Sequence, residues 1–248
     1  MKLLIDLGNT RLKWATLTGA NLQAGGVFTH AGKPLFSELR REWVELARVD
    51  GVLVASVVAP TREDELDAYV HDRFGLHAEF LRSPAAALGV RNAYAEPARL
   101  GIDRFLALAA LHAEHPRAQV LASVGTALTL DALAADGVHH GGVIVASPQL
   151  MREAVLNGTA RVGTASGRCR ELPDNTADAV VTGSLYAAAG TIDRFCAAAA
   201  RRLGSVPALI LTGGGADELA PLIVPVERTH DLVLRGLALW ADALAPRR

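Results

Sequence analysis

The opening stretch MKLLIDLGNTRLKWATL constrains the fold most, because it predicts two strands joined by a tight turn. Residues 3–5 are apolar, and residues 12–17 alternate between two faces, as in a half-buried strand. Gly8, Asn9 and Thr10 separate the two segments and favour a turn. We therefore expect a β-hairpin with Asp6 immediately after its first strand.

A similar pattern recurs in the second half of the chain. The segment IDLGNTRLKWATL at 5–17 and the segment ASVGTALTLDALA at 122–134 share the order strand, glycine turn, strand, so that Gly8 corresponds to Gly125. A third glycine turn, LTGGGADEL at 211–219, follows a predicted strand. Glycine lets a ligand approach the backbone closely. We therefore expect two related units with their glycine turns at a shared cleft.

Strands and helices alternate along the rest of the chain. Apolar spacing predicts helices at 34–48, 62–74, 102–115 and 231–244, and strands at 51–58, 119–124, 141–145 and 208–211. This alternation is typical of layered α/β proteins. A second unit begins near residue 118, so we expect domains 1–117 and 118–248.

Composition excludes several classes of protein. A net charge of -1 gives no general attraction to nucleic acid or anionic lipid, and no basic stripe is interleaved with aromatic residues. No stretch reaches the roughly 18 apolar residues that span a bilayer. Cys169 and Cys196 lack metal-ligand spacing, and we interpret them as packing thiols of a cytoplasmic protein. His139 and His140 follow a predicted hairpin turn, where we expect them to be exposed.

The hairpin turn itself is a candidate phosphate site. The chain has no GxxxxGK[ST] motif, and the glycines at 213–215 lack the later glycine of GxGxxG. In the hairpin, Gly8 allows backbone N–H groups to point at phosphate, Asn9 and Thr10 add donors, and Lys13 adds a positive charge. Asp6 is suited to holding Mg²⁺ through water. The alternative is that these residues form an ordinary β-turn.

Five motifs together resemble one known family, the type III pantothenate kinases. They are DLGNTRLK at 6–13, Tyr94 followed by GIDR at 101–104, SVGTALTLD at 123–131, GG-I at 141–144 and NTADAVVTG at 175–183. The resemblance extends from residue 1 to about residue 240. It implies the acetate and sugar kinase, Hsp70 and actin fold, an α/β architecture in which two ribonuclease-H-like domains flank a nucleotide cleft. It also implies a homodimer that phosphorylates pantothenate with ATP to 4'-phosphopantothenate, the first step of coenzyme A biosynthesis.

The resemblance assigns roles to individual residues. It places the ATP phosphates at Asp6, Leu7, Gly8, Asn9, Thr10, Arg11, Leu12 and Lys13, with Asp6 close to Mg²⁺, and it adds an ATP contact at Thr126. The general base is Asp103. The pantothenate pocket is formed by Tyr94, Gly101, Ile102, Asp103 and Arg104, with a further substrate contact at Thr176.

One position departs from the family pattern. The family usually has an aspartate at the head of the second turn, where it coordinates a monovalent cation such as K⁺ or NH₄⁺, but this chain has Ser123. A hydroxyl carries no net charge, so Ser123 can at best help to coordinate the ion. The cation requirement of this member is therefore an open question.

The residues alone leave alternatives for the site and the function. Asp103 is either a base or a capping residue of the predicted helix at 102–115, and Arg104 offers a planar fork suited to a substrate carboxylate. A sugar or acetate-type kinase of the same fold is one rival hypothesis, and a non-catalytic ATP-binding regulator is another. The helix at 231–244 is expected to pack on the core or on a partner subunit.

Overall fold

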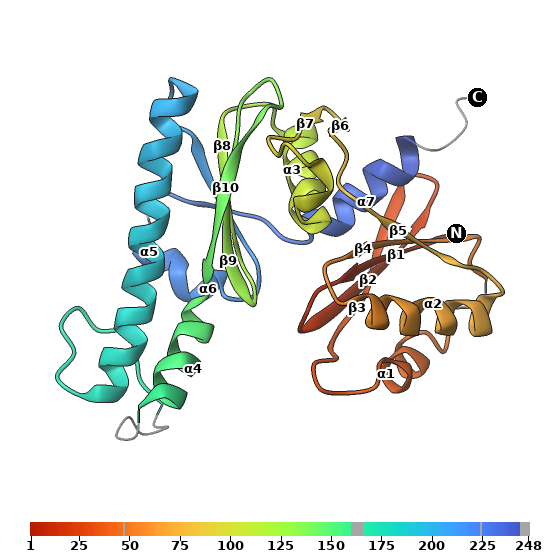
Figure 1. Ribbon diagram of the computed structural model, residues 1–248, viewed down its shortest axis with the longest axis horizontal. Helices are drawn as coiled ribbons and strands as arrows, with labels where there is room; N and C mark the ends of the chain where they lie inside the picture. Colours follow the sequence, from red (N-terminus) through yellow and green to blue (C-terminus); the bar gives the residue numbers. More distant parts are fainter. Residues whose placement is uncertain (47, 160–165, 224, 244–248) are drawn as a thin grey trace. The chain divides into compact units, whose positions relative to one another are not determined.

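The computed structural model describes residues 1–46, 48–159, 166–223 and 225–243, which form two compact α/β units (Figure 1). One unit comprises Met1–His115 together with the chain from Asp231 onward, and the other comprises Pro116–His230. Each unit contains a five-stranded sheet of its own. The α/β prediction is therefore confirmed.

The first sheet is built around the predicted hairpin. Strands β1 (Lys2–Leu7) and β2 (Arg11–Thr18) pair antiparallel, with Leu7 opposite Leu12 next to the turn. The full strand order is β3-β2-β1-β4-β5, and β1 pairs in parallel with β4. The remaining strands are β3 (Asn21–Thr29), β4 (Gly51–Ser56) and β5 (Ala78–Leu81).

Helices cover both faces of this sheet. Helices α1 (Leu35–Glu42) and α2 (Pro60–Phe74) lie on one face, and α3 (Ile102–Glu114) and α7 (Leu232–Ala243) contact the other (Figure 1). Helix α1 ends at Glu42, earlier than expected, and the next residue, Trp43, is fully buried against Trp14 and Tyr69. A short hairpin of β6 (Ala86–Ala87) and β7 (Val90–Arg91), followed by the 3₁₀ helix η1 (Pro97–Arg99), leads into α3.

Helix α7 belongs to the first unit, although residues 231–244 were expected to lie in the second domain. The helix packs closely on α3, since a Cβ on Gly236 would lie 2.3 Å from the Leu106 carbonyl oxygen. Arg235 also pairs with Glu114 of α3 at 3.0 Å. The first unit's N-terminal segment ends at His115, two residues before the expected boundary at residue 117. Apolar spacing predicted the helix but not the sheet on which it packs.

The second sheet has the same strand order as the first. Its order is β10-β9-β8-β11-β12, with β8 antiparallel to β9 and parallel to β11. Strands β8 and β9 therefore occupy the positions that β1 and β2 occupy in the first sheet, which supports the predicted repeat. Its strands are β8 (Gln119–Val124), β9 (Ala127–Leu133), β10 (His139–Ala146), β11 (Ala208–Thr212) and β12 (Glu227–Arg228).

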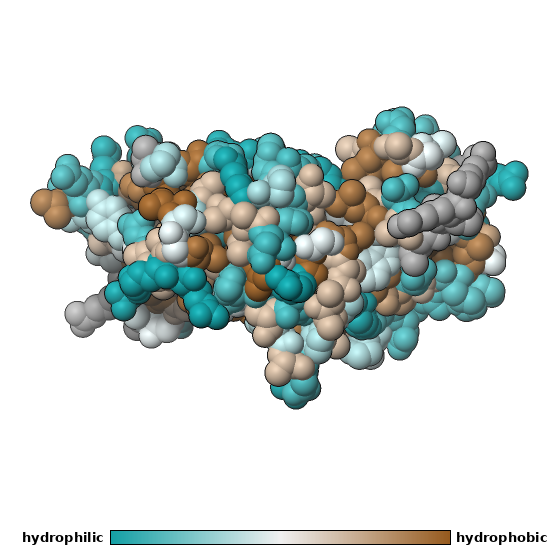
Figure 2. Space-filling view, turned by 90° about the horizontal axis from the view of Figure 1, so that it is seen from above, coloured by the Kyte–Doolittle hydropathy of each residue, from teal (hydrophilic) through white to brown (hydrophobic). Residues whose placement is uncertain are grey.

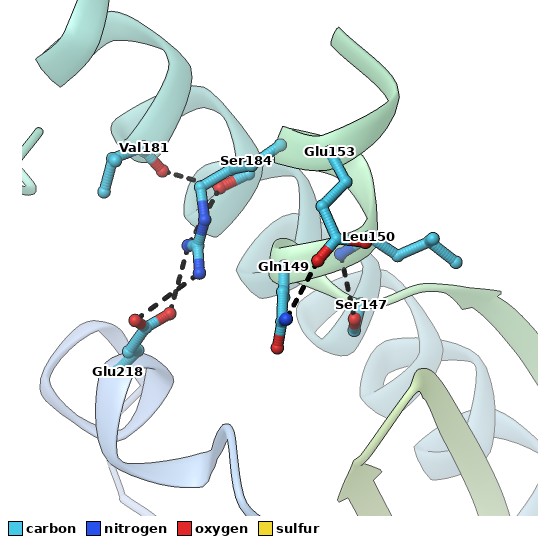
Figure 3. A network of polar contacts seen from close by, with 8 residues as sticks. Ser147, Gln149, Leu150, Glu153, Val181, Ser184 and Glu218 are labelled. Atoms are coloured by element: carbon cyan, nitrogen blue, oxygen red, sulfur yellow. Dashed lines mark hydrogen bonds and ion pairs between the residues drawn. The ribbon is translucent and has the colours of Figure 1, made fainter. Parts of the chain in front are cut away.

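Polar contacts join the helices of the second unit (Figure 3). Arg152 of α4 (Pro148–Gly158) forms an ion pair with Glu218 of α6 (Ala216–Leu219) at 3.0 Å, and its guanidinium reaches Ser184 of α5 (Thr176–Leu203) at 3.5 Å. Ser147 caps α4 by accepting a hydrogen bond from the Leu150 N–H. The 3₁₀ helix η2 (Ala220–Leu222) follows α6. These contacts fix α6, which begins directly after the third glycine turn.

Two predictions about side chains in this unit were wrong. His139 is buried, with its Nε2 2.9 Å from Oδ1 of the buried Asp131. The residue lies opposite Leu133 in the β9–β10 ladder, on the face that Leu133 shares with Asp131, so the strand turns it inward. His140 is half-buried. Both cysteines are free, but Cys169 is exposed and only Cys196 packs against the core.

The face seen in Figure 2 mixes hydrophilic and hydrophobic residues in small groups. Within the part of the chain that the structure describes, no helix is long and apolar enough to cross a membrane.

Candidate active site

The β1–β2 turn places backbone groups at the C-terminal end of β1. The Gly8 N–H donates to the Arg11 carbonyl at 3.1 Å and closes the turn, while Asn9 and Arg11 are exposed and Thr10 is half-buried. Ligands of α/β sheets bind at the C-terminal ends of parallel strands, and β1 is parallel to β4. Leu7 and Leu12 were also predicted to lie at the ATP site. Their side chains are fully buried, so only their backbone can face a ligand.

Asp6 points away from the core that α1 and α2 cover. Side chains alternate along a strand, and Leu3, Ile5 and Leu7 belong to that core. Asp6 therefore shares the opposite face of the sheet with Leu4, the face that α3 and α7 contact. Both helices begin at this end of the unit, where helix N-termini favour negative charge.

The Asp6 carboxyl is electrostatically coupled to other charged groups of this unit. Loss of hydration, and then the negative charge of Asp103, raise the pKa of Asp6 to about 7. Asp231 raises the pKa further, whereas the positive charge of Lys13 lowers it. The structure thus brings Asp6, Lys13 and Asp103, which the sequence separates by up to 97 residues, within electrostatic reach of one another.

Asp103 lies in the first turn of α3. The N-cap is Gly101, and Asp103 Oδ1 accepts a hydrogen bond from the Arg104 N–H at 2.8 Å. A Cβ on Gly101 would lie 2.5 Å from that same oxygen. The glycine therefore leaves the space that the Asp103 carboxylate occupies. Gly101 occupies the N-cap position, but Asp103 accepts from one of the free N–H groups of the first turn, so a capping contact of Asp103 is present in the structure.

Arg104 and Tyr94 contact each other beside the start of α3. The Arg104 Nη1 donates to the Tyr94 hydroxyl at 3.2 Å, and the guanidinium carbon lies 5.9 Å from the ring centroid. Arg104 is only 7% exposed, so its charge lies largely out of water. Asn92 holds the loop in place, since its Oδ1 accepts from the Tyr94 N–H at 3.0 Å. Ile102 is buried, which leaves its backbone as the group able to face a ligand.

Two residues that the sequence analysis did not single out belong to this site. Asp231 forms an ion pair with Lys13 at 3.3 Å and has a φ of 54°, in the left-handed region. His30 contacts the turn through Gly8. An aspartate before an apolar helix is a recognisable helix-start signal, but its contact with Lys13 spans 218 residues and has no local sequence signal.

A cavity of about 530 Å³ opens beside the turn in the first unit. Asn9, His30, Thr61 and Arg62 are among its lining residues. Arg62 forms an ion pair with Glu65 at 2.6 Å, also on the wall of this cavity. The exposed side of the turn is therefore hollow and polar.

In the second unit, the structure brings the second and third glycine turns together. The Gly125 N–H donates to the Ala127 carbonyl at 2.9 Å, and the Gly215 N–H donates to the Val124 carbonyl at 3.0 Å. Gly213 has a φ of 97°, and a Cβ there would lie 2.4 Å from the Val124 oxygen. Thr126 is exposed on the second turn, and Thr176 is exposed at the first turn of α5.

The residues of the first unit fit Mg²⁺ bound together with a nucleotide. The described residues contain no group of three His, Cys, Asp or Glu side chains placed to hold a metal ion alone. Mg²⁺ at nucleotide sites is usually held by one or two carboxylates plus phosphate oxygens and water. A cation beside Asp6 would offset the desolvation and the repulsion that raise its pKa.

Comparison with known proteins identifies the fold. A Campylobacter jejuni protein described as a conserved Baf family transcriptional activator matches with a TM-score of 0.63 at 17% identity, over 98% of this chain and 100% of its own. A Sinorhizobium meliloti protein described as a 2-dehydro-3-deoxygalactonokinase has a TM-score of 0.63 at 13% identity, over 100% of both chains. The fold is that of the acetate and sugar kinases, Hsp70 and actin, with two ribonuclease-H-like domains.

Sequence comparison identifies the family. A family model for type III pantothenate kinase matches residues 2–198. A type III pantothenate kinase of Xanthomonas oryzae pv. oryzae (strain PXO99A) is 39% identical over 245 residues, which are 98% of each chain. The chain therefore belongs to the type III pantothenate kinase family.

Proposed function

We propose that this protein transfers the γ-phosphoryl group of ATP to pantothenate, forming 4'-phosphopantothenate and ADP in the first step of coenzyme A biosynthesis. Family membership over most of the chain supports the reaction. The observation that carries the site assignment is the coupling of Asp6, near the end of β1, to Asp103 at the start of α3. A phosphate site and a base within electrostatic reach of each other are what phosphoryl transfer to a hydroxyl needs.

In the proposed reaction, Asp103 accepts the proton of the pantothenate hydroxyl. The hydroxyl oxygen then bonds to the γ-phosphorus, and the bond from that phosphorus to the β–γ bridging oxygen breaks, which releases ADP. Hydrogen bonding to the Arg104 N–H holds the Asp103 carboxylate in one orientation, so that the base needs little rearrangement. Ile102 and Gly101 contribute the backbone beside it.

We assign the ATP phosphates to the turn. Gly8, Asn9, Thr10 and Arg11 offer backbone N–H groups there, and Lys13 adds a positive charge. Mg²⁺ would be held by Asp6 and by phosphate oxygens, where it supplies neutralisation of the phosphate charge during transfer. In the second unit, Thr126 is assigned to ATP and Thr176 to the acceptor, both on family grounds. A monovalent cation, K⁺ or NH₄⁺, is proposed near Ser123 on the same grounds.

Arg104 is proposed to bind the pantothenate carboxylate. Its guanidinium is largely buried and lies against Tyr94, so water screens its charge weakly. The planar fork matches a carboxylate in a way that an ammonium group does not. Arg104→Lys is therefore expected to raise the KM for pantothenate at least tenfold while the KM for ATP changes little. Equal changes in both constants would contradict the assignment.

The test of the function is ADP release by the purified protein in MgATP, with and without pantothenate. Asp103→Asn is the variant that removes the base while keeping the size of the side chain. Pantothenate-dependent release that this variant lacks is the expected result. ADP release that requires a sugar or acetate would favour another kinase of this fold, and ATP binding without turnover would favour the regulatory alternative. We also propose a cytoplasmic homodimer, for which the check is the mass of the purified protein in solution.

A further inference from the structure

His30 contacts the phosphate turn at two points. The residue directly follows β3, and its backbone N–H donates to the Thr10 carbonyl at 3.1 Å. Its side-chain Nε2 lies 2.8 Å from the Gly8 carbonyl oxygen. Both contacts reach the peptide groups that separate β1 from β2. The imidazole is 2% exposed, so it holds the turn from the protein side.

The contact with Gly8 determines the tautomer of His30. A carbonyl oxygen can only accept a hydrogen bond, so Nε2 must carry the proton. Nδ1 is buried and has no hydrogen-bond partner among the residues that the structure describes. A buried nitrogen without a partner costs stability. The protein keeps this imidazole although its Nδ1 lacks a partner. We therefore take the hydrogen bond from Nε2–H to Gly8 as the role of the side chain.

Holding the Gly8 carbonyl also fixes the next N–H group. In a planar trans peptide, the C=O of one residue and the N–H of the following residue point in opposite directions. The Gly8 oxygen points to the buried His30, so the Asn9 N–H must point away from it. Asn9 is exposed, whereas His30 is buried on the other side of this peptide. His30 therefore orients one of the donors that a phosphate group at this turn would use.

We propose that His30 is a positioning residue for the nucleotide phosphates, acting through the Gly8–Asn9 peptide. This inference rests on the proposed function, which places the phosphates of ATP at this turn. Without the Nε2–H donor, the Gly8 carbonyl loses its buried partner, and the peptide group is free to rotate. Rotation would turn the Asn9 N–H out of alignment with the phosphate. The effect should therefore fall on ATP rather than on pantothenate.

Three variants of His30 separate this role from simple packing. Gln places an amide N–H donor at about the position of Nε2, Asn places one at about the position of Nδ1, and Leu fills the space without any donor. We expect His30→Leu and His30→Asn to raise the Kd for MgATP roughly five- to tenfold, the loss of about one neutral hydrogen bond. His30→Gln should stay within about twofold of the wild-type protein. The KM for pantothenate should change by less than about twofold in all three.

A second histidine provides the matched control. His112 of α3 also has a buried Nδ1 without a partner among the described residues, and it packs against Gly89, away from the turn in sequence. His112→Leu should leave the Kd for MgATP unchanged even if it lowers the melting temperature. If His30→Leu does not fold, the comparison of Gln with Asn, both amides, still tests the proposal.

Calorimetric titration measures the Kd for MgATP without turnover. The role of His30 can therefore be tested separately from the proposed kinase function. A wild-type protein that binds ATP but does not phosphorylate pantothenate contradicts the proposed function alone. His30→Asn and His30→Leu with wild-type Kd values for MgATP overturn the role of His30. The same is true if the KM for ATP and the KM for pantothenate rise together by the same factor.

Discussion

Asp6 and Asp103 are coupled carboxyl groups: loss of hydration, and after it the negative charge of Asp103, raises the pKa of Asp6 to about 7. One belongs to the central strand of the first unit, and the other belongs to the first turn of α3. Two carboxylates that repel each other attract a cation or share a proton, and both outcomes suit a site for phosphoryl transfer. The relationship makes the stability of the unliganded protein depend on pH.

The first prediction concerns Asp6→Asn. The pKa of Asp6 is raised from 3.8 to about 7 on folding, so between about pH 4 and pH 7 the unfolded chain loses this proton while the folded chain keeps it. Rising pH therefore favours unfolding across this window, and above about pH 7 the loss of stability is complete. Asp6→Asn has no such proton to lose. The variant should match the wild-type protein near pH 4 and exceed its free energy of unfolding at pH 8 by a few kcal/mol.

Urea unfolding at several pH values in the absence of nucleotide and Mg²⁺ measures this difference. Asp103→Asn removes the neighbouring charge that helps to raise the pKa of Asp6. In this variant the free energy of unfolding should fall less steeply with rising pH than in the wild-type protein, but it should still fall. Wild-type and Asp6→Asn curves that run parallel from pH 4 to pH 8 would show that folding does not raise the pKa of Asp6, and an unchanged pH dependence in Asp103→Asn would show that the two carboxyls are not coupled.

The second prediction concerns Gly101→Ala. The new Cβ would lie 2.5 Å from Asp103 Oδ1, the end of a side chain that is able to rotate away. The protein should therefore fold, but with its base displaced, and kcat should fall roughly 100-fold. Gly51→Ala is the matched control in the same unit, because its Cβ meets only the Lys2 side chain at 4.0 Å. Steady-state kinetics that do not distinguish the two variants would contradict the placement of Asp103.

Much of this architecture follows from local sequence signals. Glycine, asparagine and aspartate favour turns through their own backbone preferences. For that reason the sequence predicted the hairpin around Gly8, its counterpart around Gly125 and the turn at Asp136 and Gly137. The motif residues 101–104 were correctly placed at the start of a helix. Local signals do not show which other helix or strand each element packs against. The contact between Lys13 and Asp231 and the return of α7 to the first unit both depend on distant segments. The burial of His139 depends on the pairing of β10 with β9, which decides the face of the sheet to which the side chain points.

Stability of the second unit depends on the close contact between its glycine turns. Gly213 has a positive φ, and a Cβ there would lie 2.4 Å from the backbone of Val124. Gly213→Ala should therefore lower the free energy of unfolding by about 2 kcal/mol or more. Gly183→Ala on the exposed face of α5 meets nothing within 4 Å and should raise it by about 0.5–1 kcal/mol. Thermal unfolding of both variants checks the contrast, and a neutral Gly213→Ala would refute the close approach.

Ser123 offers a test of the monovalent cation. Serine presents a neutral oxygen at the position where the family usually has a carboxylate, so a bound K⁺ would lack one ionic ligand. Ser123→Asp should then lower the K⁺ concentration that gives half-maximal turnover. Titrations of turnover with KCl, at ionic strength held constant by a bulky organic cation, measure that concentration. The same half-maximal concentration in both proteins would place the cation elsewhere.

Phosphoryl transfer to pantothenate can be observed by following the phosphoryl group itself. ATP carrying a radiolabelled γ-phosphate is incubated with the purified protein, Mg²⁺ and pantothenate, and the products are separated and identified by mass spectrometry. We expect labelled 4'-phosphopantothenate with the wild-type protein, and a rate lower by roughly 100- to 10,000-fold with Asp103→Asn. Label that appears only in inorganic phosphate, or equal rates in the two proteins, would contradict it.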